Sequence, residues 1–420
     1  MSMRYFVIII LFLSFRQPSF SQDSMPASRV VCYLSDQNSF TEIPAHEFIL
    51  GSGRLSATSN IEVTYIDFPE QAKTSFEYAV AIWEKYLIST QTIRIKAAWS
   101  KTITNTVLAE TGATRLYRNS ASIPNLPYAN VWYPTPLAEA LSGKDLNAAD
   151  FEMTITLNAN INWYLGTDAK AQAGKYDIVT VLLHEIAHGL GFSSSMSVND
   201  SQGLYGQSGS AYVFDTFMQD SNKVKLTNSS VYGNPSIDLK TSLISNSLYF
   251  GLKNPVFANN LPRLFAPSPF KSGSSFSHFD ESTYTVGSAN SLMSPSVRAA
   301  EVNHTPGDLL LNCLNEIGWQ INGLNGYVVT NVESIPEQNF DVLVFPNPVE
   351  DSVNVAFPLQ KQPRAIKIDL IDNLGKVLQS IEKRDIMVET IAIDLVTLKE
   401  GMYFLKVVDG QKVLVKKIVK

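Results

Sequence analysis

Residues Val179 to Phe192 carry the pattern that most constrains this chain. They read V-T-V-L-L-H-E-I-A-H-G-L-G-F, so an H-E-x-x-H core lies inside an apolar run. On a helix, His184 and His188 lie four positions apart on one face, and both imidazoles can reach one metal ion at about 2.0–2.1 Å. Glu185 lies beside them and reaches a water activated by that metal. The pattern predicts a catalytic Zn²⁺ site with Glu185 as general base.

The residues around this core also suit a metal site. Gly189 and Gly191 follow the second histidine, where a helix must stop and the chain must leave sharply. The alternative is a buried amphipathic helix with two incidental histidines. Only five histidines occur in 420 residues, and the pentapeptide has the helical, apolar context that the motif requires. The metal-binding interpretation is therefore preferred.

The third metal ligand does not follow the commonest spacing. A catalytic zinc takes three protein ligands and keeps one position open. The pattern H-E-x-x-H-x-x-G-x-x-H would place a histidine where the chain has Ser194, whose neutral hydroxyl is a poor ligand. His278 precedes an L-M-S-P turn and is the preferred third ligand. His304 and carboxylates such as Asp215 or Asp280 remain alternatives.

The first 21 residues predict export. They have a basic start at Arg4, an apolar run over residues 5–13 and a plausible cleavage point before Gln22. The run is shorter than the roughly 20 residues that span a bilayer, so residues 1–21 are expected to be a signal peptide, with no stable transmembrane segment after its removal. A net charge of −6 gives no reason to expect nucleic acid, and protein or peptide partners are expected instead.

The chain has two cysteines, Cys32 and Cys313. In an exported protein we expect a single disulfide closing a long loop, with two buried thiols as the main alternative. A third hypothesis, that Cys32 blocks the zinc as a latency switch, is disfavoured because the segment before the first expected strand is short.

Residues 22–322 alternate between strand and helix patterns. Ile61 to Phe68 predicts a strand, Pro69 opens a long amphipathic helix, and Thr92 to Trp99 and Phe151 to Leu157 predict further strands. The metal-binding helix is expected at Tyr176 to Leu190. We expect an α+β domain with a twisted sheet, an active-site helix and a C-terminal helix.

Three further features of this domain are expected. Residues 153–163 are the candidate edge strand for pairing with an extended peptide. Residues 193–277, rich in Ser, Asn, Gly and Pro, predict a long insertion. The final helix should begin with Thr305 as its cap, Pro306 in its first turn and Asp308 as a capping-box acid.

A change of composition predicts a second domain. Residues 323–339 are polar with scattered Gly and Pro and predict a linker. Residues 340–420 hold short alternating strands separated by N-P, N-L-G, K-E-G and D-G turns, with no convincing helix. This predicts a small all-β sandwich.

Several motifs together resemble the leishmanolysin-like metzincins, over roughly residues 60–322. These are H-E-I-A-H-G-L-G-F-S, a long insertion, S-H-F-D-E, L-M-S-P and L-N-E-I-G-W. The resemblance implies a secreted zinc endopeptidase with His278 as a displaced third ligand, Gly191 in the extended helix motif and Met293 in a turn beneath the metal. The rival functions are an inactive metalloprotease-like surface adhesin and a zinc hydrolase acting on a non-peptide amide.

The last 80 residues resemble the type A sorting domain of type IX secretion substrates. The matching pieces are V-F-P-N-P at Val344 to Pro348, L-G-K-V around Gly375, L-K-E-G-M-Y-F-L-K-V and the basic end K-K-I-V-K. The resemblance implies that residues 340–420 engage the type IX machinery and that the protein is secreted or held at the cell surface after crossing the outer membrane. On physical grounds alone, a carbohydrate- or protein-binding sandwich fits equally well.

Overall fold

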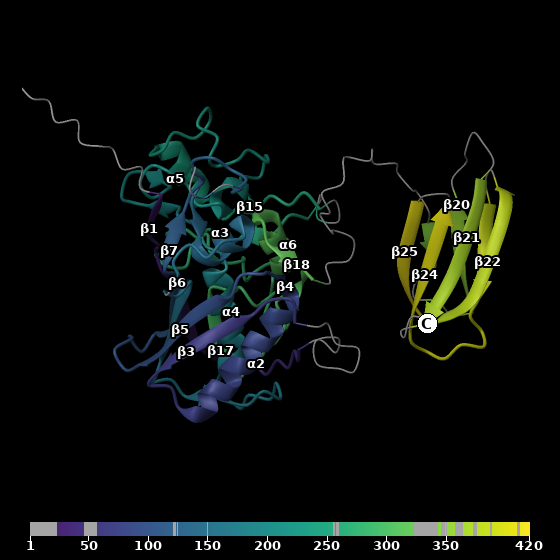
Figure 1. Ribbon diagram of the computed structural model, residues 1–420, viewed down its shortest axis with the longest axis horizontal. Coiled ribbons are helices and arrows are strands. Elements are labelled where there is room, and N and C mark those ends of the chain that lie inside the picture. The colour runs from purple at the N-terminus through teal and green to yellow at the C-terminus, as the bar shows by residue number, and fades with distance from the viewer. Residues whose placement is uncertain are drawn as a thin grey trace, which may run out of the picture. The chain divides into compact units, whose positions relative to one another are not determined.

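We describe the protein from a computed structural model, in which the chain divides into two compact units, residues 1–329 and 330–420 (Figure 1). The structure describes residues 23–45, 57–120, 123, 125–148, 150–254, 257 and 260–322 of the first unit. In the second unit it describes residues 343–345, 349, 351–357, 364–372, 376–386, 389–409 and 412–420. The expected signal peptide at 1–21 and linker at 323–339 lie outside these ranges.

A six-stranded mixed sheet organises the first unit. Its order is β17-β2-β6-β9-β5-β3. The strands are β2 (Val30–Asn38), β3 (Ile61–Ile66), β5 (Ile93–Ser100), β6 (Val107–Ala113), β9 (Met153–Asn158) and β17 (Ser296–Ala299). Strands β3, β5 and β9 run parallel, β6 is antiparallel to both β9 and β2, and β17 is parallel to β2. The last pairing brings residues from opposite ends of the unit side by side.

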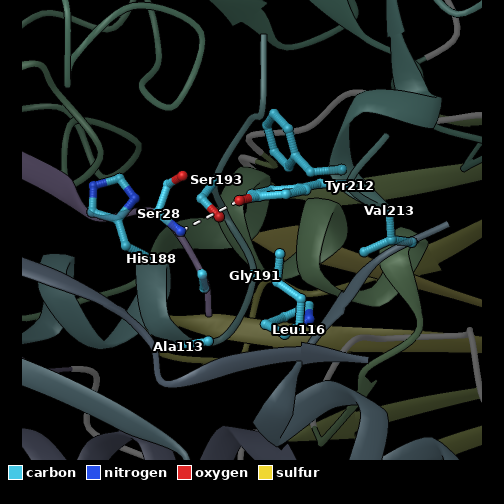
Figure 2. A pocket seen from close by; sticks show the side chains of 11 residues that line it. Ser28, Ala113, Leu116, His188, Gly191, Ser193, Tyr212 and Val213 are labelled. Carbon is cyan, nitrogen blue, oxygen red and sulfur yellow. Dashed lines mark hydrogen bonds between the residues drawn. The ribbon is translucent and has the colours of Figure 1, made fainter. Parts of the chain in front are cut away.

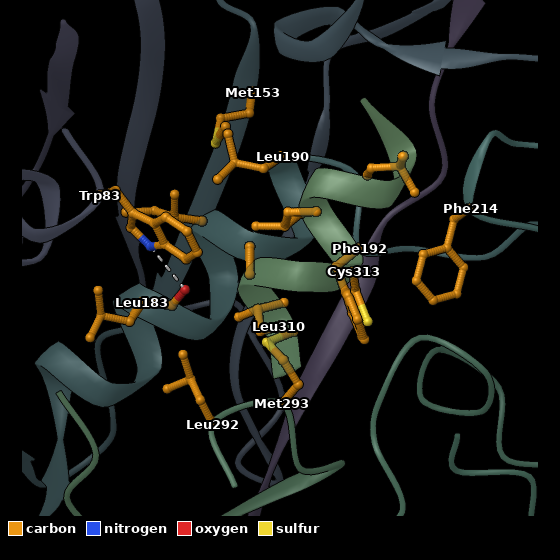
Figure 3. Close-up of a cluster of buried hydrophobic side chains, with 14 of the residues drawn as sticks. Trp83, Met153, Leu183, Leu190, Phe192, Phe214, Leu292, Met293, Leu310 and Cys313 are labelled. Atoms are coloured by element: carbon orange, nitrogen blue, oxygen red, sulfur yellow. Dashed lines mark hydrogen bonds between the residues drawn. The ribbon is translucent and has the colours of Figure 1, made fainter. Parts of the chain in front are cut away.

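Two long helices pack side by side against this sheet. Helix α2 (Glu70–Tyr86) begins after Pro69, as its sequence predicts, and buries the stripe that includes Phe76, Ala79 and Trp83. Helix α4 (Ile178–Gly189) contacts α2 as well as β2, β6 and β9. The indole nitrogen of Trp83 donates a 3.3 Å hydrogen bond to the carbonyl of Leu183, which joins the two helices (Figure 3).

Shorter elements complete the first unit. Before α4 they are β1 (Ser24–Pro26), β4 (Leu87–Ile88), β7 (Arg115–Tyr117), β8 (Tyr133–Pro134), α3 (Thr135–Ser142), β10 (Trp163–Tyr164) and β11 (Tyr176–Asp177). After it come β12 (Ser197–Val198), β13 (Gly203–Leu204), η1 (Phe214–Phe217), β14 (Met218–Gln219), α5 (Ile237–Leu243), β15 (Leu248–Phe250), β16 (Arg263–Leu264), α6 (Gly307–Ile317) and β18 (Gln320–Ile321). The described residues of the expected insertion at 193–277 therefore include small sheets, the 3₁₀ helix η1 and the short helix α5.

Two expectations about the sheet are wrong. Residues 153–163 do not form an edge strand, because β9 lies between β5 and β6 and is paired on both sides. The first strand expected from the sequence begins at Ile61, yet β2 precedes it and belongs to the same sheet. Neither pairing is local in sequence, and strand patterns alone do not reveal which strands become neighbours.

The expected disulfide is also wrong. Cys32, on β2, and Cys313, on α6, are both buried free thiols, which is the alternative that the sequence left open. The start of α6 differs from expectation as well. Pro306 occupies the cap position without a side-chain hydrogen bond, and the amide of Leu309 is bonded by the side-chain oxygen of Asn290 at 3.1 Å. The hydroxyl of Thr305 accepts a 3.3 Å bond from the amide of Gly307, so the expected local residue and the distant Asn290 share the capping of α6.

The second unit consists of two antiparallel sheets around one core. The first sheet has the order β19-β20-β23 and the second β22-β21-β24-β25. The strands are β19 (Leu343–Phe345), β20 (Ser352–Phe357), β21 (Arg364–Asp372), β22 (Val377–Ile386), β23 (Glu389–Asp394), β24 (Met402–Asp409) and β25 (Lys412–Val419). Alternate residues such as Val353 and Val355 of one sheet, and Leu405 and Val407 of the other, share a buried cluster. This alternation is typical of a β-sandwich.

Candidate metal centre

Helix α4 is held at both ends by its own flanking residues. Asp177 caps its start and accepts a 2.7 Å hydrogen bond from the amide of Thr180. At its end, Gly191 has φ +115°, a conformation that favours glycine, and a Cβ there would lie 3.0 Å from Pro134 and 3.1 Å from Ile317. The chain can therefore turn back beneath the helix, which places the carbonyl of Phe192 against the His188 ring.

Three histidines meet at one point. Nε2 of His184 lies 3.0 Å from Nε2 of His188 and 3.3 Å from Nε2 of His278. At least one ring nitrogen from each residue lies within 4.8 Å of the others. All three side chains are buried. The structure therefore brings His278, from beyond the insertion, to the two histidines of α4.

Backbone carbonyls fix the orientation of each imidazole. Nδ1 of His184 lies 2.8 Å from the carbonyl of Leu292, Nδ1 of His188 lies 2.7 Å from that of Phe192, and Nδ1 of His278 lies 2.6 Å from that of Ser274. A carbonyl oxygen only accepts, so each Nδ1 carries the proton and donates it. In the neutral rings the three Nε2 lone pairs then face one another. Such an arrangement is unfavourable without a cation between them, and it is the arrangement of metal-ligating histidines.

Burial keeps these rings neutral. It lowers the pKa of His184 to about 4 and that of His278 to about 3, the latter helped by the neighbouring His184. The pKa of His188 is also held well below its usual value, by burial first and by the other two rings next. Neutral imidazole is the form that binds metal, so all three are ready to act as ligands near neutral pH.

Glu185 is buried beside them without a partner. Neither carboxylate oxygen has a hydrogen-bond partner among the described residues, and the side chain is fully buried. Burial, with a smaller effect from Glu110, raises the pKa of Glu185 well above its usual value. An orphaned buried carboxylate is costly, and a cation next to it would offset that cost.

The turn that contains Met293 is joined to both parts of the histidine cluster. The carbonyl of Leu292 holds His184, and the carbonyl of Met293 accepts a 2.8 Å bond from the amide of Phe279, the residue after His278. The Met293 side chain is fully buried beside Leu310 and Cys313 (Figure 3). Its role among the described residues is packing beneath this junction.

The alternative third ligands lie elsewhere. Asp215 accepts hydrogen bonds from the hydroxyl of Ser194 at 2.6 Å and from the amides of Ser195 and Tyr212. Asp280 accepts from Ser282 and Thr283 and faces Arg263 at 3.6 Å.

His304 forms a buried pair with a helix-capping residue. Its Nε2 lies 2.9 Å from Oδ2 of Asp177, the cap of α4, and both side chains are fully buried. His304 therefore stabilises the start of the helix rather than joining the three-histidine cluster.

The N-terminal segment lies close to the cluster, which the sequence analysis considered only for Cys32 and disfavoured. A small cavity beside His188 is lined by Ser28, Gly191 and Tyr212, and the amide of Ser28 donates a 3.4 Å hydrogen bond to the Tyr212 hydroxyl (Figure 2). A larger, more open cavity of about 340 Å³ shares Ser28, Ser193 and Tyr212 with it. The sulfur of Cys32 also lies within 4.8 Å of a His184 nitrogen and a Glu185 oxygen.

Comparison with known families assigns the second unit. Residues 343–420 match the family described as the secretion system C-terminal sorting domain. The C-terminal unit is a type IX secretion sorting domain. This sorting domain links the chain to the type IX machinery and marks it for export to the cell surface or the medium. Within the part of the chain that the structure describes, no helix is both long and apolar enough to cross a membrane.

The comparisons for the first unit are short. Residues 129–262 match a family described as SPBPB7E8-like, a range that includes α4 but ends before His278. The chain is 40% identical over 68 residues to Uncharacterized protein PB7E8.01 of Schizosaccharomyces pombe, covering 16% of this chain and 12% of that protein. In the region of the sorting domain, the crystal structure of dimeric latent PorU from Porphyromonas gingivalis is 21% identical, with a TM-score of 0.17, over 19% of this chain and 9% of that one.

Proposed function

We propose that the first unit is a zinc-dependent endopeptidase that acts on extracellular proteins or peptides. The observation that carries this proposal is the convergence of the Nε2 atoms of His184, His188 and His278, each with its Nδ1 held by a backbone carbonyl. Ligands about 2.0–2.1 Å from a tetrahedral zinc lie about 3.3 Å from one another. The Nε2 atom of His184 lies 3.0 Å from that of His188 and 3.3 Å from that of His278, which fits this value.

The donor set also fits a catalytic rather than a structural zinc. Three imidazoles leave one of four positions for water, whereas structural sites take all four ligands from the protein. Zinc held there supplies a Lewis acid that polarises the scissile carbonyl and lowers the pKa of water. Glu185, adjacent to His184 in sequence and without another partner, takes the proton from the attacking water and returns it to the leaving amine.

The rival functions differ in what they require of Glu185. An inactive surface adhesin has no chemical need for a buried carboxylate without a hydrogen-bond partner, and such a group lowers stability. A hydrolase of a non-peptide amide would use the same residues. A peptide substrate is preferred because of the resemblance to leishmanolysin-like metzincins. The sorting domain adds that the substrates are met after export, and we propose that the chain reaches the outer surface of the cell.

The test combines metal content with hydrolysis. The purified full chain should bind one zinc and cleave an unstructured protein, and a chelator should abolish cleavage reversibly. Glu185→Gln should keep the zinc but lose at least about 10²-fold in rate, the lower end for a general base. Glu139→Gln is the matched control, because Glu139 is an equally buried carboxylate on α3 away from the cluster. Zinc binding without any cleavage would favour the adhesin, and full activity in Glu185→Gln would refute its role as base.

A further inference from the structure

The open cavity of about 340 Å³ adjoins the histidine cluster. Three of its lining residues, Ser28, Ser193 and Tyr212, also line the small cavity beside His188, so the two cavities share a wall (Figure 2). A group bound in the larger cavity therefore lies next to the proposed metal centre.

Much of this cavity is formed by the two stretches of chain that connect the metal-binding histidines to the insertion. One stretch, residues 193–197, follows α4, and the other lies within residues 272–277 and leads directly into His278. Seven serines are among the residues from these two stretches and the N-terminal segment that line the cavity: Ser28, Ser193, Ser194, Ser195, Ser197, Ser272, Ser275 and Ser277 include them. The lining is therefore rich in hydroxyl groups.

Several of these hydroxyls have a proton left to donate. The hydroxyl oxygen of Ser277 accepts a 3.0 Å hydrogen bond from the amide of Ser194, and that of Ser275 accepts a 2.9 Å bond from the amide of Lys271. Both serines are buried, and neither hydroxyl donates to a residue that the structure describes. The side chain of Ser193 makes no hydrogen bond within the same described ranges. Because a hydroxyl carries one donor, the cavity offers donors to a ligand.

The charges around the cavity are already paired. Arg29 lines it, but its guanidinium forms a 3.0 Å ion pair with Glu110. Asp215 accepts hydrogen bonds from the hydroxyls of Ser194 and Ser195, which line the cavity in its place. A charged side chain entering here would lose water without gaining a counter-ion, and an apolar one would leave the serine donors unpaired.

We propose that this cavity is a substrate subsite that selects an uncharged side chain able to accept hydrogen bonds, an amide or a hydroxyl, close to the cleaved bond. The inference rests on the proposed endopeptidase function and names its substrate class. Glutamine has the longest side chain of this kind. The volume lies within the range of about 300–1,000 Å³ that is typical of ligand pockets, so the cavity accommodates that side chain together with ordered water. Ser275 and Ser277 donate to its carbonyl oxygen.

The experiment measures kcat/KM of the zinc-loaded full chain on fluorogenic peptides that carry Gln, Glu, Lys or Leu at one position at a time beside the cleaved bond. At one of these positions, Gln should exceed each of the other three by at least about tenfold, because a site built for hydrogen bonds rejects groups that leave it unpaired. Glu has nearly the shape of Gln, so this pair isolates the effect of charge, and Leu isolates the effect of hydrogen bonding.

Two serine variants connect the preference to the cavity. Ser193→Leu narrows the cavity and removes a hydroxyl from it, so its preference for Gln over Leu should largely disappear. Ser229→Leu is the matched control, because Ser229 is an exposed serine of the same insertion and does not line the cavity, and this variant should keep the preference. An unchanged preference in Ser193→Leu would overturn the assignment. If Ser193→Leu does not fold, the wild-type peptide series still decides the proposal.

A binding measurement separates this inference from the proposed function. Zinc-loaded Glu185→Gln should bind the Gln peptide more tightly than the Leu peptide, as measured by fluorescence anisotropy. Cleavage by the wild type without a preference for Gln would overturn the subsite and leave the endopeptidase standing. Selective binding of the Gln peptide without any cleavage by the wild type would overturn the endopeptidase and keep the cavity as a peptide-binding site. Neither cleavage nor binding of any of the peptides would overturn both.

Discussion

The carbonyl of Leu292 accepts a 2.8 Å hydrogen bond from Nδ1 of His184, across 108 positions of the sequence. This bond sets the tautomer of a histidine on α4 from a turn that follows the insertion. The next carbonyl, that of Met293, bonds the amide of Phe279 beside His278. One turn therefore orients the imidazole of His184 and anchors the backbone next to His278, and its packing should matter to metal binding.

We expect Met293→Ala to weaken the site through this turn. Removing a fully buried methionine side chain leaves a cavity and costs about 2–5 kcal/mol of unfolding free energy. Zinc affinity should fall with it, because the carbonyl of Leu292 loses its fixed position. Met293→Leu keeps the volume and should cost less than about 1.5 kcal/mol. Denaturant unfolding and zinc titration of both variants test this, and an equally large loss for leucine would point to a specific role for the sulfur.

The third ligand is tested by two histidine variants. His278→Ala should lose most of the zinc affinity, because two imidazoles on one helix cannot complete the site. His304→Ala should keep one zinc per chain but unfold more easily, by about 1–3 kcal/mol, since it removes a buried hydrogen-bond partner of the Asp177 carboxylate. Metal analysis and thermal unfolding separate the two effects. Zinc lost from the folded His304 variant and retained by the His278 variant would reverse the assignment.

Gly191→Ala should disturb the same centre from beneath. The position has φ +115°, and an added Cβ would press on Pro134 and Ile317. We expect a loss of about 1–3 kcal/mol together with weaker zinc binding, as the Phe192 carbonyl moves away from His188. Gly174→Ala is the control. Gly174 also has a positive φ, +73°, but no atom lies within 4 Å of the position that an added Cβ would take. Equal effects of the two variants on zinc affinity would contradict this account.

Glu139 gives the stability a predictable dependence on pH. Burial raises the pKa of Glu139 to about 8, although the amide of Leu146 bonds its carboxylate and opposes the rise. In the unfolded chain the pKa is about 4.3. Between these two pKa values, Glu139 holds a proton in the folded state that it has lost in the unfolded state. The contribution of protonated Glu139 to the free energy of unfolding is therefore complete below about pH 4.3 and is lost as pH rises through 8.

The measurement is the pH dependence of unfolding by urea. Glu139→Gln can accept the same bond from Leu146 without a titrating group. Its stability relative to the wild type should increase steadily from pH 5 to pH 8, by about 1–3 kcal/mol in total, and then level off. A constant difference between the two proteins across this range would show that Glu139 is ionised in the folded state.

Local patterns explain why part of the molecule could be predicted from sequence. Helix α2 and strands β3 and β5 follow from apolar periodicity and from Pro69, which are properties of neighbouring residues. The spacing of His184 and His188 is also local. His278 could be selected as a candidate only because few histidines were available and one preceded the L-M-S-P turn.

The wrong predictions all concern contacts between distant residues. The position of β9 in the middle of the sheet depends on β6, which precedes it by 40 residues or more and lies antiparallel. Asn290 joins Thr305 in capping the start of α6, and no spacing rule relates Asn290 to that helix. The free state of Cys32 follows from its place on β2, a strand whose short apolar run gave no clear periodic signal.

The amide of Ser194 donates a 3.0 Å hydrogen bond to the hydroxyl of Ser277, so the chain leaves the vicinity of α4 and returns to it at neighbouring points. The intervening segment of about 80 residues therefore begins and ends at two residues that are hydrogen-bonded to each other. The last part of the segment also holds His278, because the carbonyl of Ser274 orients its ring and the amide of Phe265 bonds its carbonyl. Changes in length and content that spare these residues and the serine pair should therefore leave the three imidazoles in place, so the surface formed by the rest of the segment can vary separately from the metal geometry.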